Sequence, residues 1–118
     1  MTFQTFYGQQ ADQFSFIYIP KALMTEDHFS GIQSWSKIIY GFLMDRMRLS
    51  AKNRWIDERG RMYVIYPARE MQKDMGIPKK KVLEYLKELE DAGLLEKKPG
   101  ALGLPDRIYL KNIKVEQT

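Results

Sequence analysis

The sequence predicts an α+β fold, and three observations support this prediction. Apolar residues recur at helical spacing over 35–47 and again over 82–89. Short runs rich in aromatic and β-branched residues, closed by proline or glycine, are typical of strands. Between Arg69 and Lys98 the order is helix, tight turn, helix and strand. The predicted architecture is therefore a winged helix-turn-helix with three main helices, a small antiparallel sheet and a C-terminal β-hairpin wing.

The composition narrows the class of protein. A chain of 118 residues is long enough for one domain, 1–118, with a substantial core. It contains no cysteine and a single histidine, so we expect no disulfide, no metal site and no cofactor. The N-terminus has no secretory signal pattern and no apolar run is long enough to span a bilayer, so we expect a cytoplasmic protein with no membrane partner. The net charge of +4 and pI near 9.3 are compatible with nucleic-acid binding.

The N-terminal part is predicted to contain an arm, a strand and a loop. Residues 1–13 form the arm. The run Phe14–Ile19 is predicted as a strand that Pro20 ends. Residues 21–33 are predicted as a loop with one helical turn at Thr25–Phe29.

A long helix follows this loop. Ser34 or Ser36 is expected to cap it, and it is predicted to run to about Leu49. Gly41 inside it weakens the helix slightly and permits close packing. The apolar stripe of this helix comprises Trp35, Ile38, Ile39, Phe42, Leu43 and Met47.

The middle of the chain reads as a basic loop and a small hairpin. The loop covers Ser50–Arg54, and the strands Arg54–Ile56 and Arg61–Tyr66 flank the turn 57–60. We expect an ion-paired surface here, because acidic residues are interspersed among the basic ones. The basic residues are Arg46, Arg48, Lys52, Arg54, Arg59 and Arg61, and the acidic ones are Asp45, Asp57 and Glu58.

The helix-turn-helix itself is marked by its turn residues. Met71 and Met75 lie on one face of the first helix, which Gly76 cannot easily continue. Pro78 is predicted to open the second helix, where its missing N–H does no harm. Gly93 ends that helix at a position suited to a left-handed residue. The buried stripe of the second helix is Val82, Leu86 and Leu89.

The wing and tail complete the chain. Leu94–Lys97 and Arg107–Lys111 are predicted as paired strands, joined by the connector 98–106. Residues 114–118 are predicted to be a tail.

Three lysines at the start of the second helix carry the functional argument. Lys79, Lys80 and Lys81 lie at the partly positive end of the helix dipole, where each is unfavourable by roughly 0.3–1 kcal/mol. An external polyanion would reverse that sign, and in a helix-turn-helix this turn enters the major groove of DNA. The alternative is a solvated charge run, and we favour DNA contact.

Other basic residues extend this prediction. Glu84 is interpreted as a partner of Lys80 within the helix, with a contact to cytosine as the alternative. Tyr85 is predicted to have its ring in the core and its hydroxyl near a phosphate. The wing cations either bind phosphates or are ordinary surface charge. The predicted DNA-binding residues are Arg69, Lys73, Lys79, Lys80, Lys81, Lys87, Lys97, Lys98 and Arg107.

A search for catalytic motifs is negative. The chain has no phosphate-binding P-loop, no HExxH, no GxSxG and no cysteine nucleophile. His28 stands beside Glu26 and Asp27, but three adjacent loop residues do not make a site. We expect a protein that is not an enzyme.

Three segments of the chain resemble a known family. They are FIYIPKALMTEDHF, SKIIYGFLMDRMRLSAKNRWIDERGRMYVIY and GLLEKKPGALGLPDRIYLKN. They are similar to the N-terminal domain of the plasmid replication initiator protein A family of Gram-positive bacteria, and the likeness extends over 16–113. The chain departs from winged helices in general at Pro78, where many have a hydroxyl N-cap, and at Pro67-Ala68, which gives the first helix no good side-chain cap.

The resemblance implies a function and partners. It implies a winged-helix domain that binds repeated sequences in double-stranded DNA at a plasmid or mobile-element origin, as a homodimer. It also implies that host replication proteins are engaged only by a separate C-terminal domain, which we expect this chain to lack. A transcriptional regulator and a protein-interaction module remain alternatives, and a steep salt dependence of binding would favour DNA.

The aromatic N-terminus favours a dimer. Both faces of Phe14–Ile19 are largely apolar, so the predicted strand should be covered on both sides. A second subunit would supply that cover and place two lysine-tipped helices for successive major grooves. The alternative is an arm folded back on its own domain.

Overall fold

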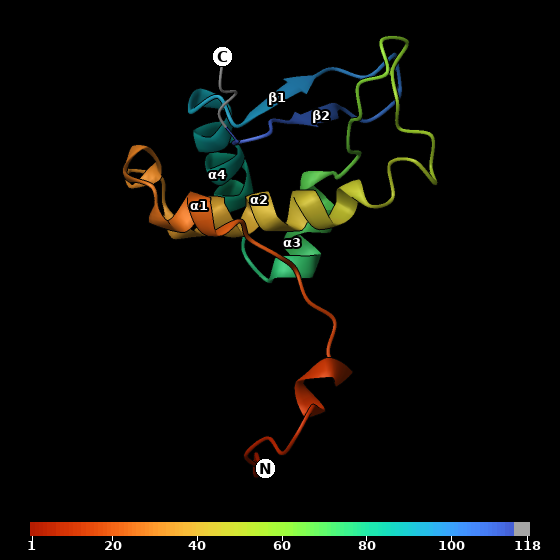
Figure 1. The fold of residues 1–118 in the computed structure, drawn as a ribbon. Coiled ribbons are helices and arrows are strands. Elements are labelled where there is room, and N and C mark those ends of the chain that lie inside the picture. The colour runs from red at the N-terminus through yellow and green to blue at the C-terminus, as the bar shows by residue number, and fades with distance from the viewer. Residues whose placement is uncertain (115–118) are drawn as a thin grey trace.

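Three longer helices, the short helix α1 and a two-stranded antiparallel sheet form the body of the described chain, and the N-terminal arm extends away from it (Figure 1). The computed structural model describes residues 1–114, so the predicted tail lies outside the described residues except for its first residue. The elements are η1 (Gln10–Gln13), α1 (Lys21–Thr25), η2 (Asp27–Phe29), α2 (Ser34–Met47), α3 (Ala68–Met75), α4 (Lys79–Asp91), β1 (Leu95–Lys98) and β2 (Arg107–Leu110). None of the described helices is long and apolar enough to cross a membrane.

The helix α2 is the central element of the core. The apolar stripe predicted for this helix accounts for one buried side, but the helix is covered on two. α4 and β2 pack against one side, and the segment before α1 packs against another. Tyr40 is 2% exposed, and its hydroxyl donates to the carbonyl of Lys111. A Cβ at Gly41 would lie 2.8 Å from Cγ1 of Ile19, which confirms the predicted close packing. The core comprises Leu23, Ile39, Tyr40, Leu43, Val64, Met71, Val82, Leu86, Leu89, Leu95 and Ile108, among others.

The predicted cap of α2 is wrong. Gln33 occupies the N-cap position, and its side chain makes no capping hydrogen bond to the helix. Instead Glu88 of α4 accepts hydrogen bonds from the backbone N–H of Gln33 (3.1 Å) and from Oγ of buried Ser36. A carboxylate from a distant helix therefore replaces the local hydroxyl, and this contact also fastens α4 to α2. The helix ends at Met47, two residues before the predicted end.

The predicted strand Phe14–Ile19 is also wrong. The segment is extended, but within the described residues it pairs with no other strand. Its alternation is still visible, because Ile17 and Ile19 lie against Gly41 while the aromatic side chains face outward. The exposed fractions of Phe14, Phe16 and Tyr18 are 53%, 52% and 77%.

Two further segments differ from the prediction. The helical turn expected at Thr25–Phe29 is present as the 3-10 turn η2, but an unexpected helix, α1, precedes it and buries Leu23 completely. The hairpin expected around 57–60 is reduced to a single bridge between Ile56 and Met62, and Val64 forms its bridge with Ile108 of β2 instead. Arg54 has a left-handed backbone (φ 58°), which interrupts the first of these strands.

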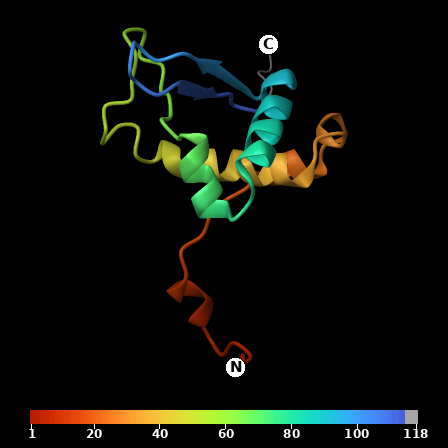
Figure 2. The same ribbon diagram turned by 180° about the vertical axis from the view of Figure 1, so that it is seen from behind.

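The wing matches the prediction to within one residue. Leu95 pairs with Leu110 and Lys98 with Arg107 in the antiparallel register. Val64 adds a single bridge to Ile108, so the chain between α2 and α3 is attached to the outer side of β2. Figure 2, from behind, shows α3 and α4 in front of α2 with the hairpin above them. The fold is a winged helix-turn-helix, as predicted.

Candidate nucleic-acid interface

The turn between α3 and α4 has the predicted geometry. Gly76 adopts a left-handed conformation (φ 68°) at the C-cap of α3, and Gly93 does so after α4 (φ 78°). Pro78 is the N-cap of α4, so the helix begins one residue later than predicted. Met71 from α3 and Val82 from α4 are completely buried. These contacts set the angle at which α4 leaves the turn.

The three lysines lie in the exposed first turn of α4. No side chain caps this N-terminus. Nζ of Lys81 lies 3.4 Å from the carboxylate of Glu84, so Glu84 pairs with Lys81 and the predicted pairing with Lys80 is wrong. Within residues 1–114, Lys79 and Lys80 have no carboxylate within 4.0 Å. An uncapped helix start with unpaired cations is a suitable site for phosphate oxygens.

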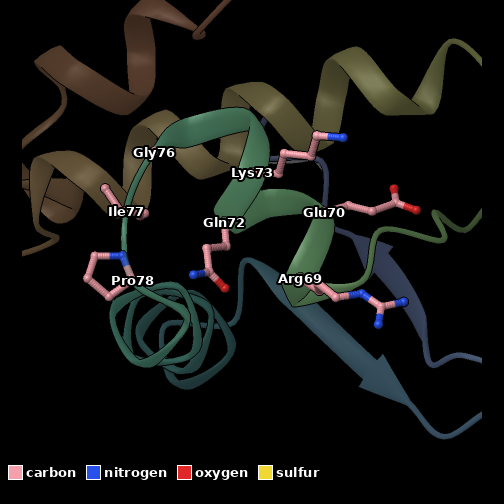
Figure 3. Close-up of a pocket in the computed structure, with 7 residues that line it drawn as sticks. All are labelled: Arg69, Glu70, Gln72, Lys73, Gly76, Ile77 and Pro78. Carbon is pink, nitrogen blue, oxygen red and sulfur yellow. The ribbon is translucent and has the colours of Figure 1, made fainter.

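An open groove lies between α3 and this helix start (Figure 3). It has a volume of about 870 Å³ and is lined by Arg69, Glu70, Gln72, Lys73, Gly76, Ile77 and Pro78. Figure 3 shows the amide of Gln72 directed towards the start of α4, while Glu70 and Lys73 extend away from Pro78. The structure therefore brings Arg69 and Lys73 close to the turn that Lys79 follows. The sequence analysis did not single out Gln72, because a lone exposed glutamine on a helix carries no distinguishing signal.

The acidic residues of α3 are neutralised from α2. The guanidinium of Arg46 lies 3.2 Å from the carboxylate of Glu70 and 3.8 Å from that of Asp74. Arg46 also stacks on the ring of Tyr66 at 3.9 Å, and the Tyr66 hydroxyl donates to Asp74 (2.6 Å). Burial, and then the neighbouring carboxylate of Asp74, raises the pKa of Tyr66. Arg46 thus offsets the negative charge beside the groove, although its partners were expected in its own segment.

The remaining part of α4 is occupied by internal contacts. Lys87 is exposed and pairs with Asp91 (2.5 Å), and the hydrogen bond from its ammonium raises the pKa of Lys87. The ring of Tyr85 is buried and stacked on Trp35 with ring centroids 6.4 Å apart. The core position of Tyr85 is therefore confirmed, and its contact with a phosphate stays a prediction.

All three wing cations have partners. Nζ of Lys97 lies 3.7 Å from Asp106, and Nζ of Lys98 lies 2.9 Å from Glu96. The guanidinium of Arg107 lies over the ring of Tyr63, 4.4 Å from its centroid. Arg107 therefore contributes to the attachment of the wing, whereas the two lysines are exposed and can exchange their carboxylates for phosphates.

The basic segment between α2 and α3 is only partly ion-paired. Arg48 pairs with Asp45 (2.6 Å) and Arg61 with Asp57 (2.9 Å), as expected. The prediction is wrong for three cations. Within the described part of the chain, Lys52, Arg54 and Arg59 have no carboxylate within 4.0 Å, and all three are exposed.

Asp57 is the acceptor that organises this segment. Its side chain is 3% exposed. It accepts hydrogen bonds from the backbone N–H groups of Arg59 and Arg61, from Nε of Arg61 and from the hydroxyl of Tyr109, at 2.9–3.0 Å. Desolvation would raise the pKa of Asp57, but these four bonds together outweigh it and lower the pKa to about 2.

Comparisons with known proteins agree on one group of relatives. A family model described as "Replication initiator protein A (RepA) N-terminus" matches residues 15–118. A curated protein of Lactobacillus helveticus, called "41 kDa protein", is 31% identical. The match covers 84% of this chain but only 30% of that relative's length.

Three solved structures have the same fold. "N-Terminal domain of DNA binding protein" is 33% identical with a TM-score of 0.78, over 98% of this chain and 88% of that one. "Structure of Rep-DNA complex" is also 33% identical with a TM-score of 0.78, over 97% and 88%. "Structure of MDR initiator" is 30% identical with a TM-score of 0.75, over 97% and 90%.

Proposed function

This chain belongs to the family of replication initiator protein A N-terminal domains, and on that premise we propose that it binds double-stranded DNA at a plasmid or mobile-element origin. In this proposal the binding is sequence-specific and starts replication of the element. The similar solved chain described as a Rep-DNA complex supports the DNA-binding part of the proposal. The carrying observation is the trio of lysines at the uncapped start of α4.

We call Lys79, Lys80 and Lys81 the lysine turn, and of these only Lys81 has a carboxylate partner within the described part of the chain, which is Glu84. Lys79 and Lys80 have no counter-charge within the described residues, and they stand where the helix dipole disfavours cations. A DNA phosphate or base edge in the major groove would turn this cost into a favourable contact. Arg69 and Lys73 lie at the groove next to this turn, where the backbone of the same duplex would pass.

The wing and the arm have supporting roles in this proposal. Lys97 and Lys98 contact phosphates without reading bases. Two copies of the chain associate through the aromatic side chains of the N-terminal segment, which are exposed in the single chain. A two-fold dimer presents two α4 helices to successive turns of the duplex.

The test replaces Lys79, Lys80 and Lys81 together by alanine. We expect an intact fold, a strong fall in DNA affinity and a salt slope reduced by about 0.9 for each phosphate that is no longer neutralised. The DNA is a duplex that the unaltered protein selects from random sequence.

The matched control replaces Lys21, Lys111 and Lys114. The control set has the same make-up as the lysine turn. Lys21 and Lys114 are exposed and have no ion pair within the described residues, and Lys111 pairs with the exposed side chain of Glu96. It should leave affinity nearly unchanged. Equal DNA affinity of the two triple variants would contradict the assignment of α4 as the helix that reads the DNA. An affinity that does not change with salt concentration would favour a protein-interaction module.

A further inference from the structure

The segment between α2 and α3 contains uncompensated positive charge. We call residues 48–61 the basic loop. Within it, Arg48 and Arg61 are ion-paired, while Lys52, Arg54 and Arg59 are exposed and have no carboxylate within 4.0 Å among residues 1–114.

Backbone and buried side-chain contacts hold the loop in place. The N–H of Asn53 donates to Leu49 (2.8 Å), and the N–H of Trp55 donates to Ser50 (2.7 Å). Ser50 is completely buried, and its hydroxyl donates to the carbonyl of Tyr63 (2.9 Å). The ring of Trp55 packs against the core. The unpaired cations therefore project from an ordered support.

The loop is attached to the wing. The Tyr109 hydroxyl of β2 donates to Asp57 (3.0 Å), and the guanidinium of Arg61 lies over the Tyr109 ring at 4.9 Å. A second contact of the same kind is made by Arg107 of β2, whose guanidinium lies over the ring of Tyr63. In Figure 1 the yellow-green loop accordingly stands beside the blue hairpin. A partner that contacts the wing is therefore also close to the basic loop.

Arg54 gives a second, independent indication. It is the only residue other than glycine with a positive φ (58°) in the described chain. Asparagine or glycine would occupy this backbone with less strain. A long cationic side chain at such a position loses stability relative to asparagine or glycine, and a phosphate contact would offset that loss.

We propose that the basic loop is a second DNA-contacting surface, which binds the phosphate backbone of the duplex beside the wing. The inference rests on the proposed function, because DNA is the polyanion placed at the wing. Contacts of this kind add affinity and position the domain, and they carry no sequence information.

The first test is the double variant Lys52→Gln, Arg59→Gln. We expect weaker binding to matched and mismatched duplexes by the same factor, and a salt slope lowered by up to about 1.8, since each neutralised phosphate accounts for about 0.9. The matched control is Lys21→Gln, Lys114→Gln, which removes two exposed cations elsewhere on the molecule that have no ion pair within residues 1–114. The control should change neither quantity appreciably.

The second test uses the strained position. Arg54→Asn should keep the loop conformation, raise or preserve the melting temperature and still weaken DNA binding. Arg54→Lys keeps the charge and should retain most of the affinity. A loss of affinity in Arg54→Asn accompanied by a lower melting temperature would attribute the effect to unfolding of the loop and overturn the contact.

The outcomes separate this inference from the proposed function. If the loop variants bind DNA normally while the lysine-turn variant does not, the basic loop is not a DNA contact and the function stands. If both bind normally, the proposed function fails as well. A loss confined to the matched duplex would mean that the loop reads bases and would overturn a role limited to the backbone.

Discussion

Asp57 links the basic loop to the wing. Its carboxylate accepts two backbone and two side-chain hydrogen bonds from partners on both, and it is almost completely inaccessible to water. These donors stabilise the ionised carboxylate and thereby lower the pKa of Asp57. One residue thus positions the loop cations relative to β2.

Asp57→Asn should destabilise the protein in a pH-dependent way. The folded pKa of about 2 lies below the ordinary value of 3.8, so the stabilisation is present above about pH 4 and is lost as the pH falls through 2. We therefore expect the urea midpoints of the two proteins to differ by a constant amount above about pH 5 and to converge towards pH 2. A difference of equal size at both ends would show that the charge is not its source.

At the scale of elements, the start of α2 and the body of α4 stabilise each other. Glu88 accepts hydrogen bonds from Gln33 and Ser36 at the N-terminus of α2, where a negative charge also complements the helix dipole. Desolvation would raise the pKa of Glu88, but the hydrogen bonds from Ser36 and Gln33 lower it overall. The packing of α4 on α2 therefore depends on a carboxylate that belongs to α4.

Glu88→Ala should lower the free energy of unfolding by roughly 1–2 kcal/mol, as the loss of a helix cap does. Chemical denaturation measures this value. The control is Glu84→Ala on the same helix, which removes only an exposed ion pair and should stay within about 0.5 kcal/mol. Equal costs for the two variants would argue against capping by Glu88.

The wing has two kinds of cation that mutagenesis should separate. Arg107→Gln removes the contact with the Tyr63 ring, so we expect a lower melting temperature. Lys97→Gln with Lys98→Gln removes only exposed ion pairs, so stability should hold while DNA binding weakens equally on matched and mismatched duplexes. Thermal melts and titrations of both duplexes distinguish them. A loss confined to the matched duplex would mean that the wing reads bases.

At the scale of the whole molecule, the N-terminal segment is the least covered part. Ile17 and Ile19 pack next to α2, while Phe3, Phe6, Phe14, Phe16 and Tyr18 are more than half exposed. Aromatic surface of this extent is typical of a contact with another chain. A second copy would bury it and supply the second α4.

Deletion of residues 1–16 should therefore yield a monomer. The cut spares Ile17 and Ile19, so the packing at Gly41 and the melting temperature should be retained. Loss of the second reading helix should lower affinity for a two-site duplex by on the order of 10²-fold. Sedimentation of both proteins at micromolar concentration, alone and with DNA, tests this. An intact chain that stays monomeric in both conditions would refute the dimer.

The sequence alone determined the elements whose signals are local. The positions of α2, α3, α4 and the wing strands follow from helical or alternating periodicity, and Gly76 and Gly93 end their helices where predicted. The placement of the three lysines in the first turn of α4 follows from the same pattern. These signals are reliable because they act within one or two turns of the chain, where neighbouring residues are fixed by geometry.

Only the tertiary structure decided which distant groups meet. Glu88 caps a helix whose N-cap residue, Gln33, lies 55 residues earlier, and the hydroxyl of Tyr109 donates to Asp57 across 52 residues. Arg46 takes its partners from α3, while Asp45 and Asp57 pair with Arg48 and Arg61, and Lys52, Arg54 and Arg59 have no carboxylate within 4.0 Å among the residues described. The segment 14–19 remains unpaired as well, because a strand needs an edge to join. Periodicity reports which face of an element is apolar, but the partner of a charge depends on how the elements pack.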